Sequence, residues 1–444
     1  MKKTALLLAT LDTKGQEALF LKSVLERLGV GVLILDAGIF PSPVGEGDIK
    51  RHEVAMAGGR PVDELIRAGN KGEAISTMIS GAVALTRRLY DEGRIHGALS
   101  IGGAQGTIIG TTAMRSLPLG VPKIMLSTMA SGRRVFETYV GTSDVTLIHS
   151  VVDFFGLNSV LRQMLSNAAG ALAGMLQTST PTDATTASVG DPAGPVRASD
   201  RPQVAITIYG TTTPAGMRIV SLLQKKCYEA VAFHPNGVGG RAMEEMIAQG
   251  RFAGVIDLTL HELIDEIAGG QHTAGPDRLE AASRMGIPQV VVPGSTDYIV
   301  TGRFSELKKS FRQRTTMMHN PEMTFVMPSE REMAKLGEIV ARKLNPTAGR
   351  GNTVVMVPLK GFCYPNFEGR PLYNPGGVRA FVAALQKRIK PSIPLRLLPL
   401  HVNDEAFADA VVEEFETLMR TVTPTNVQAA SVGAKVASLQ NRKE

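Results

Sequence analysis

Short apolar runs alternate with longer amphipathic segments from the start of the chain. An apolar run over 5–10 precedes a segment over 15–28 whose apolar positions recur at helical spacing, and a second apolar run covers 31–35. A strand, a helix and another strand in this order are typical of a parallel sheet with crossover helices. Because the apolar runs are continuous, we expect both faces of the sheet to be covered. The pattern predicts an α/β fold on a mainly parallel, doubly wound sheet.

The same alternation fills two blocks of the chain. In the first block, further strands are predicted over 95–101, 123–126 and 145–152, and helices over 73–91, 106–117 and 158–176. Residues 41–70 are polar and are predicted to form an irregular loop. In the second block, strands are predicted over 204–209, 230–233, 255–258, 289–292, 353–357 and 395–398. The segment between the blocks has linker composition. We therefore predict a Rossmann-like domain over 1–178, a linker over 179–202, a second Rossmann-like domain over 203–420 and a flexible tail over 421–444.

Composition narrows the class of protein. With 444 residues, 43% hydrophobic and 20% charged, the chain is typical of a globular protein with more than one core. The net charge of +7 is spread over both blocks without a basic stripe, so nucleic acid is not an expected partner. No apolar run approaches the length of a membrane span, and the apolar start lacks a signal-peptide cleavage site. Two cysteines without ligand spacing favour a reducing compartment, and we expect a cytoplasmic protein.

A glycine motif stands where the strand over 95–101 gives way to a helix. It reads Gly102-Gly103-Ala104-Gln105-Gly106-Thr107. Such a junction directs free backbone N–H groups at one point, and its glycines let a phosphate approach closely. The spacing matches neither the dinucleotide fingerprint nor a P-loop. The motif predicts a phosphate cradle, and the alternative is a tight strand-to-helix turn without a ligand.

Other polar loops of the first block are predicted to join this cradle. The residues are Asp12, Thr13 and Lys14 after the first strand, Ser127, Thr128, Ser131 and Gly132 after the strand over 123–126, and Asp144 in a further polar turn. Loops that follow parallel strands meet at one edge of the sheet, where α/β proteins place ligands. Arg51 is a candidate clamp for a phosphate, although a plain surface loop is the alternative. Asp12 and Thr13 can also serve as helix caps, with Lys14 in solvent.

The second block carries candidates for proton transfer at its own strand ends. His234, Asp257 and Glu262 are the catalytic candidates, and His261 and Asp297 are expected at the same edge. The segment that begins at His261 lacks the second histidine of a zinc protease helix, so no metal site is predicted. Glu262 has an alternative role as the acidic residue of a helix N-terminus.

Five motifs, in order, resemble the Tm-1-like ATP-binding family, also called UPF0261. They are residues 9–15, 102–107, 127–132, 272–276 and 361–365. The resemblance implies two Rossmann-like domains, a homodimer, and ATP bound by the first domain with magnesium. Carried onto this chain, it implies that Asp12, Thr13, Lys14, Arg51, Gly102, Gly103, Gly106, Thr107, Ser127, Thr128, Ser131, Gly132 and Asp144 form the nucleotide site.

The family resemblance implies no particular reaction, and two functions follow as hypotheses. The first is an ATP-dependent enzyme that acts on a small molecule at the cleft between the two domains. The second is a nucleotide-gated protein without catalysis, in which ATP controls binding to a partner protein such as a TIM barrel.

Overall fold

The computed structural model describes residues 2–40, 43–130, 136–178 and 201–421. Contacts divide the chain into two compact units, 1–198 and 199–444, and each unit is described by itself. Most of the predicted linker and tail, as well as Ser131 and Gly132, lies outside the described residues. Among the helices that the structure does describe, none is both long enough and apolar enough to cross a membrane.

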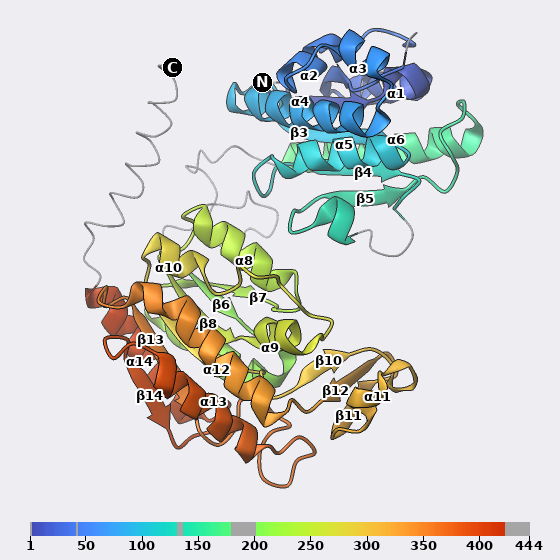
Figure 1. Ribbon diagram of the computed structural model, residues 1–444. Helices are drawn as coiled ribbons and strands as arrows, with labels where there is room; N and C mark the ends of the chain where they lie inside the picture. The colour runs from blue at the N-terminus through green and yellow to red at the C-terminus, as the bar shows by residue number, and fades with distance from the viewer. Residues whose placement is uncertain (1, 41–42, 131–135, 179–200, 422–444) are drawn as a thin grey trace. The chain divides into compact units, whose positions relative to one another are not determined.

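The first unit is built on a five-stranded parallel sheet (Figure 1). Its strand order is β2-β1-β3-β4-β5. The strands are β1 (Thr4–Ala9), β2 (Gly31–Asp36), β3 (Gly97–Gly102), β4 (Lys123–Ser127) and β5 (Thr146–His149). β1 lies between β2 and β3, with Leu6 opposite Leu33 on one side and Ala98 on the other. The parallel α/β class predicted from the sequence is confirmed.

Helices cover both faces of this sheet. One face packs against α2 (Arg51–Ala57), α3 (Val62–Ala68), α4 (Lys71–Asp91) and α5 (Ala104–Arg115), and the other against α1 (Leu11–Arg27) and α6 (Ser159–Thr178). A π-helical turn covers Phe136–Val140. Leu6 and Leu8 face the first group of helices, whereas Leu7 and Ala9 face the second. This alternation explains why β1 is apolar along its whole length.

Residues 43–70, which belong to the predicted irregular loop, are more ordered than predicted. They contain α2 and α3, whose Val54 and Leu65 are buried in the same core as α4. A Cβ atom at Gly81 of α4 would lie 1.8 Å from the carbonyl oxygen of Val54, so α2 and α4 approach each other closely because Gly81 lacks a side chain. Few apolar residues carry this packing, which is why a polar loop is the wrong prediction here.

The second unit has a six-stranded parallel sheet of order β14-β13-β9-β8-β6-β7. Its strands are β6 (Gln203–Thr207), β7 (Glu229–Phe233), β8 (Gly254–Thr259), β9 (Gln289–Gly294), β13 (Thr353–Pro358) and β14 (Leu395–Leu398). One face packs against α7 (Thr213–Lys225) and α14 (Glu405–Thr421). The other packs against α8 (Gly239–Ala248), α9 (His261–Ala268), α10 (Ala281–Met285), α12 (Glu330–Leu344) and α13 (Pro375–Arg388).

A small antiparallel sheet is inserted between β9 and α12. It consists of β10 (Ile299–Thr301), β12 (Met323–Val326) and β11 (Thr316–Asn320), in this spatial order. The ring of Phe325 on β12 stacks on Tyr298, with ring centroids 4.3 Å apart. The sequence prediction missed this sheet, because its strands are short and only partly apolar. Short helical turns cover Gly210–Thr212, Phe304–Glu306, Lys309–Arg312 and Asn345–Thr347.

Candidate functional site

The turn between β3 and α5 carries the glycine motif. β3 ends at Gly102 and α5 begins at Ala104, with Gly103 at the capping position. No side chain caps this helix, and the N–H groups of Ala104, Gln105 and Gly106 have no hydrogen-bond partner among the described residues. Free N–H groups and the positive end of the helix dipole favour an anion at such a position. The turn therefore has the backbone arrangement that phosphate cradles use.

Space is open in front of this turn at Gly103. Among the described residues, a Cβ atom at Gly103 would have only the hydroxyl oxygen of Thr128 within 4 Å, at 3.7 Å. A Cβ atom at Gly102, in contrast, would lie 2.9 Å from the Cα atom of Gly106. Gly102 is therefore required by the turn itself, whereas the absence of a side chain at Gly103 leaves room beside the helix end.

The hydroxyl groups of Thr107 and Ser127 face the protein interior. Both residues are fully buried, and Thr107 Oγ1 lies 2.6 Å from Ser127 Oγ and donates to the carbonyl oxygen of Gly103 at 2.7 Å. Ser127 Oγ also accepts the N–H of Met129 at 2.8 Å. These two hydroxyls brace the turn instead of facing a ligand, which corrects their predicted role. The half-buried Thr128 carries the hydroxyl that lies beside the open space at Gly103.

Asp12 stands in the first turn of α1, directly after β1. Its Oδ2 accepts the backbone N–H groups of Ile39 and Phe40 at 2.8 and 2.7 Å, and so fixes the segment after β2. Its Oδ1 is buried without a hydrogen-bond partner among the described residues. A buried carboxylate oxygen without a donor suits a cation, or a water molecule bound to one.

A second carboxylate lies beside Asp12. Asp36, at the end of β2, accepts the N–H groups of Leu11 and Gly38 through Oδ1, at 3.0 and 2.9 Å. Burial raises the pKa of Asp36, the two backbone donors partly oppose this, and the charge of Asp12 raises the pKa further. Two acidic groups therefore meet at the ends of neighbouring strands, and β1 is also the neighbour of the cradle strand β3.

Arg51 lies close to this acidic pair. It is the first residue of α2, and its guanidinium donates to the carbonyl oxygen of Phe40, the residue whose N–H is bound by Asp12. The charge of Arg51 also lowers the pKa of Asp36. The structure thus places Arg51 at the start of α2, near the acidic pair, and its role as a phosphate clamp stays a prediction.

The side chains of Thr13 and Lys14 contact neighbouring groups of the protein itself. The hydroxyl of Thr13 lies 2.9 Å from that of Thr10, and the ammonium of Lys14 donates to the carbonyl oxygen of Phe154 at 2.7 Å. Asp12 and Thr13 line a cavity of about 290 Å³, together with Val44 and residues 154–156 among others. The cradle glycines do not line this cavity. Lys14 is therefore held on the side of α1 that contacts the segment after β5.

Asp144 lies at the opposite edge of the sheet. It precedes β5, so it stands where the parallel strands begin. Its Oδ1 binds the ammonium of the fully buried Lys123 at 2.6 Å, and its Oδ2 accepts the N–H of Gly120 at 2.8 Å. The structure therefore contradicts its predicted place beside the glycine turn, because that turn follows β3 at the edge where the strands end.

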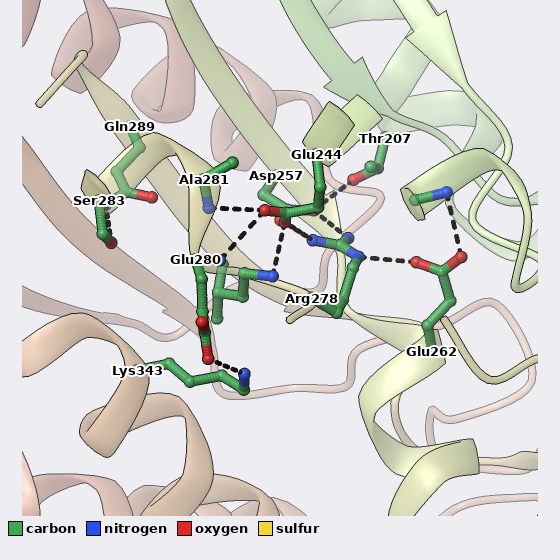
Figure 2. A network of polar contacts seen from close by, with 12 residues as sticks. Thr207, Glu244, Asp257, Glu262, Arg278, Glu280, Ala281, Ser283, Gln289 and Lys343 are labelled. Carbon is green, nitrogen blue, oxygen red and sulfur yellow. Dashed lines mark hydrogen bonds and ion pairs between the residues drawn. The ribbon is translucent and has the colours of Figure 1, made fainter. Parts of the chain in front are cut away.

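A buried arginine organises the polar interior of the second unit (Figure 2). Arg278 is 1% exposed and lies among the carboxylates of Glu244, Asp257 and Glu262. Its guanidinium donates to both oxygens of Asp257, at 2.5 and 2.7 Å, and to Glu262 Oε2 at 2.7 Å. A longer bond of 3.2 Å reaches Glu244 Oε1. One cation therefore neutralises part of the charge of three acidic groups.

Backbone donors occupy the remaining oxygens of this network. Glu262 Oε1 accepts the N–H groups of Gly237 and Gly240 at 2.8 and 3.1 Å, and Glu244 accepts those of residues 279–281. Burial raises the pKa of Glu244, with Arg278 opposing the shift. For Arg278, burial lowers the pKa, but the surrounding carboxylates outweigh this and raise it well above its usual value.

The network corrects the prediction that Asp257 and Glu262 are catalytic. Both carboxylates are buried and directed at Arg278, so neither offers an oxygen to a substrate. Glu262 stands in the first turn of α9, as the alternative interpretation had it. The sequence does not reveal this role, because Arg278 comes from an irregular segment with no periodic pattern.

A histidine and an aspartate meet in the interior after β8. His261 is fully buried at the start of α9, and its Nδ1 lies 2.7 Å from the carbonyl oxygen of Ser295, to which it donates. Its Nε2 has no hydrogen-bond partner among the described residues and lies 3.4 Å from Asp265 Oδ2. Burial lowers the pKa of His261, but Asp265 and the Ser295 carbonyl outweigh it, so that the pKa is raised.

Two more histidines and a tyrosine join this pair. Asp265 Oδ2 accepts the N–H of His272 at 2.8 Å, and His272 Nδ1 lies 2.7 Å from the hydroxyl of Tyr209. The ring of Tyr209 stacks on His234 with centroids 4.8 Å apart. Burial, with the charge of His261, lowers the pKa of His272 to about 4, so this ring is neutral at pH 7. Burial raises the pKa of Tyr209, so this hydroxyl keeps its proton at pH 7. Tyrosine and histidine are side chains that can take part in proton transfer to a bound molecule.

Sequence reasoning found only part of this cluster. It named His234 and His261, but it missed Tyr209, Asp265 and His272 as site residues. One available signal is the spacing of four residues between His261 and Asp265, which places both on one face of a helix.

Asp297, also predicted at the edge of the second sheet where the strands end, is hydrogen-bonded within the protein interior. It is buried, and its Oδ2 accepts from Asn366 Nδ2 at 2.6 Å and from the N–H of Phe362 at 2.9 Å. Burial raises its pKa, and the hydrogen bonds oppose the shift.

A cavity of about 740 Å³ lies away from these groups, at the C-terminal ends of α12 and α13. Its lining includes Lys335, Arg342, Arg388 and Lys390, but no histidine. These helix ends precede β13 and β14, so the cavity lies at the edge where the strands begin. It therefore shares no residue with the candidate site.

Family models match both halves of the chain. The Uncharacterised protein family (UPF0261) N-terminal domain matches residues 3–181, and the Uncharacterised protein family (UPF0261) C-terminal domain matches residues 201–419. A UPF0261 protein of Clostridium tetani is 36% identical over 420 residues, which cover 94% of this chain and 100% of that protein.

The tomato ToMV resistance protein Tm-1(GCR237) is 33% identical over 78% of this chain and 44% of its own length. Among solved structures, the glycosyltransferase SnogD from Streptomyces nogalater is 14% identical. The match covers 94% of this chain and 100% of that one at a TM-score of 0.19, a likeness too weak to support an argument about function.

Proposed function

This chain belongs to the UPF0261 family, and we propose that it binds ATP by its phosphate groups at the start of α5 in the first unit. The observation that carries the proposal is the free first turn of this helix. The N–H groups of Ala104, Gln105 and Gly106 have no partner among the described residues, and the missing side chain of Gly103 leaves space in front of them. Phosphate oxygens are the acceptors that such a helix end favours.

The acidic pair after β1 and β2 fits the magnesium that accompanies ATP. Magnesium prefers carboxylate oxygens, and Asp12 Oδ1 is buried without a hydrogen-bond partner among the described residues. Asp36 and Arg51 flank this group, so that the site combines anionic and cationic side chains. The ion would neutralise phosphate charge, while the backbone of α5 orients the phosphates.

We further propose that the protein is an enzyme for a small molecule that binds at the ends of the strands of the second sheet. Tyr209, His234 and His272 support this, because they gather near a buried aspartate and can transfer protons. A protein that only recruits a partner has no need of such a cluster. The homodimer implied by the family resemblance is a separate proposal, which sedimentation velocity tests.

Calorimetric titration of the full chain with MgATP tests the nucleotide site. The variant Gly103→Val places a branched side chain in the open space, and we expect it to weaken ATP binding at least about tenfold. The matched control is Gly170→Val, where a Cβ atom meets nothing within 4 Å on the exposed side of α6. Both variants should keep the wild-type circular dichroism spectrum.

Three ligands separate the possible outcomes of this titration. Tripolyphosphate should compete with ATP, and adenosine alone should bind far more weakly, because the phosphates make the contacts with the α5 amides. A wild-type protein that binds no ATP, or a Gly103→Val variant that binds ATP as tightly as the wild type, contradicts the proposal. Lys14→Ala should lower the affinity less than Gly103→Val, because the ammonium of Lys14 is already bound to Phe154.

A further inference from the structure

His261, Asp265 and His272 bring three metal-ligating groups together in the second unit. Their candidate ligand atoms all lie within 4.8 Å of one another. His261 and Asp265 are fully buried, and His272 is partly exposed. We propose that these three side chains bind a divalent transition-metal ion such as zinc. The proposal does not rest on ATP binding, because it concerns residues of the other unit only.

The hydrogen bond of His261 directs a free nitrogen at the site. Nδ1 donates to the carbonyl oxygen of Ser295 at 2.7 Å, which is the contact that commonly orients a metal-binding histidine. Nε2 is then the nitrogen available to a metal, and it is buried without a hydrogen-bond partner among the described residues. A buried polar atom without a partner is costly, and a metal ion would satisfy it.

The spacing of His261 and Asp265 matches that of two ligands on one ion. Nε2 of His261 lies 3.4 Å from Asp265 Oδ2. Two ligands at about 2.1 Å from a tetrahedral zinc ion lie about 3.4 Å apart. The ring nitrogen and the carboxylate oxygen can both donate a lone pair to a cation that lies between them.

Asp265 also positions the third ligand. Its Oδ2 accepts the N–H of His272 at 2.8 Å, and its Oδ1 accepts the N–H of Val300 at 3.0 Å. These bonds tie the segment that carries His272 to α9, while the ring of His272 reaches the hydroxyl of Tyr209. The donor set of two imidazoles and one carboxylate suits zinc and neighbouring transition metals rather than magnesium or calcium.

Three protein ligands leave at least one coordination position open. Such an arrangement is typical of catalytic metal sites, whereas structural zinc sites have four protein ligands. His261 and Asp265 form the buried side, so the open position lies toward His272, the member that solvent reaches. The site would then present the ion to a small ligand next to Tyr209.

Metal titration of the chelator-treated full chain tests the proposal. Zn²⁺ is titrated in competition with a chromophoric chelator, and Co²⁺ is titrated separately for the visible absorption of a four-coordinate site. We expect one strongly bound ion per chain. The variant His272→Ala should bind Zn²⁺ at least about 100-fold more weakly, whereas His272→Cys, which supplies another zinc ligand, should retain tight binding.

His234→Ala is the matched control. His234 stacks on Tyr209 at the same edge, but it does not belong to the three ligands, so this variant should bind Zn²⁺ like the wild type. Circular dichroism verifies that each variant is folded. A wild-type chain without a tight Zn²⁺ site overturns the proposal, as does a His272→Ala variant with wild-type affinity and Co²⁺ spectrum.

Discussion

Replacement of Arg278 by methionine should destabilise the second unit strongly. The substitution removes hydrogen bonds to Glu244, Glu262 and Thr259 and two to Asp257, and it leaves three buried carboxylates without their cation. Methionine keeps much of the volume of the side chain, so the principal loss is electrostatic.

The expected loss of stability is about 3–5 kcal/mol, which is typical when one partner of a buried ion pair is removed. Backbone N–H groups still bind Glu244 and Glu262, and Thr207 still binds Asp257, so part of the stabilisation of these anions survives. The loss is a large share of the free energy of unfolding of a typical domain, which is about 5–15 kcal/mol.

Urea unfolding of the full chain measures this loss. The protein has no tryptophan, and only two of its seven tyrosines, Tyr90 and Tyr139, belong to the first unit, so tyrosine fluorescence reports mainly on the second. The control is Arg284→Met, which removes an exposed ion pair to Glu280 and should cost less than about 1 kcal/mol.

The loss should also depend on pH. Burial already raises the pKa of Glu244, and removal of Arg278 should raise it further. The folded variant then binds protons more readily than the unfolded chain, so acidification from pH 7 toward pH 5 should reduce the difference from the wild type. A loss no greater than that of Arg284→Met, with no dependence on pH, would refute the role of the network.

Two further predictions concern packing and a helix cap. Gly110→Ala should destabilise the first unit by about 1–3 kcal/mol in thermal unfolding, because the new Cβ would lie 2.1 Å from Ser100 Oγ, whereas Gly170→Ala, in open space, should be neutral or stabilising. Equal melting temperatures for these two variants would contradict the packing described here. Burial raises the pKa of Glu332, but hydrogen bonds from Arg314 and the α12 cap outweigh it, so the pKa is lowered. Above its pKa in the unfolded chain, Glu332 therefore contributes about 1 kcal/mol to the free energy of unfolding. This contribution disappears as the pH falls through the lower pKa that Glu332 has in the folded protein. Urea unfolding of Glu332→Gln should show this loss at pH 7 and none in strong acid, and a loss that persists in acid would count against it.

The sequence predicts the two sheets well because their strands are buried on both faces. Continuous apolar runs such as 5–10 are typical of such strands, and the fold class is confirmed. The order of residues 43–70 and the inserted sheet of β10–β12 were not predicted, since a few residues such as Val54 and Phe325 carry their packing. Such packing depends on tertiary neighbours that local patterns do not contain.

The same distinction applies to the candidate site residues: the position of some follows from local sequence, whereas the role of others depends on residues far away in the chain. The turn from strand to helix at Gly103 lies where the sequence pattern predicts it, because backbone geometry follows from local sequence, whereas its role as a phosphate cradle stays a prediction. The roles of Asp257 and Glu262 depend on Arg278, which reaches them from an irregular segment. Asp144 shows a different limit of the sequence prediction. A polar turn that precedes a strand and a polar turn that follows one lie at opposite edges of a parallel sheet, and Asp144 belongs to a turn that precedes β5.

Hydrogen exchange of the α5 amides tests the central claim most directly. The N–H groups of residues 104–106 have no hydrogen-bond partner among the described residues, so they should exchange fast in the free protein. Saturation with MgATP should slow exchange in a peptide that covers 103–107, whereas adenosine should not, and Gly103→Val should need a higher MgATP concentration for the same effect. If ATP binds and slows exchange only elsewhere in the chain, the phosphate site is not at the start of α5.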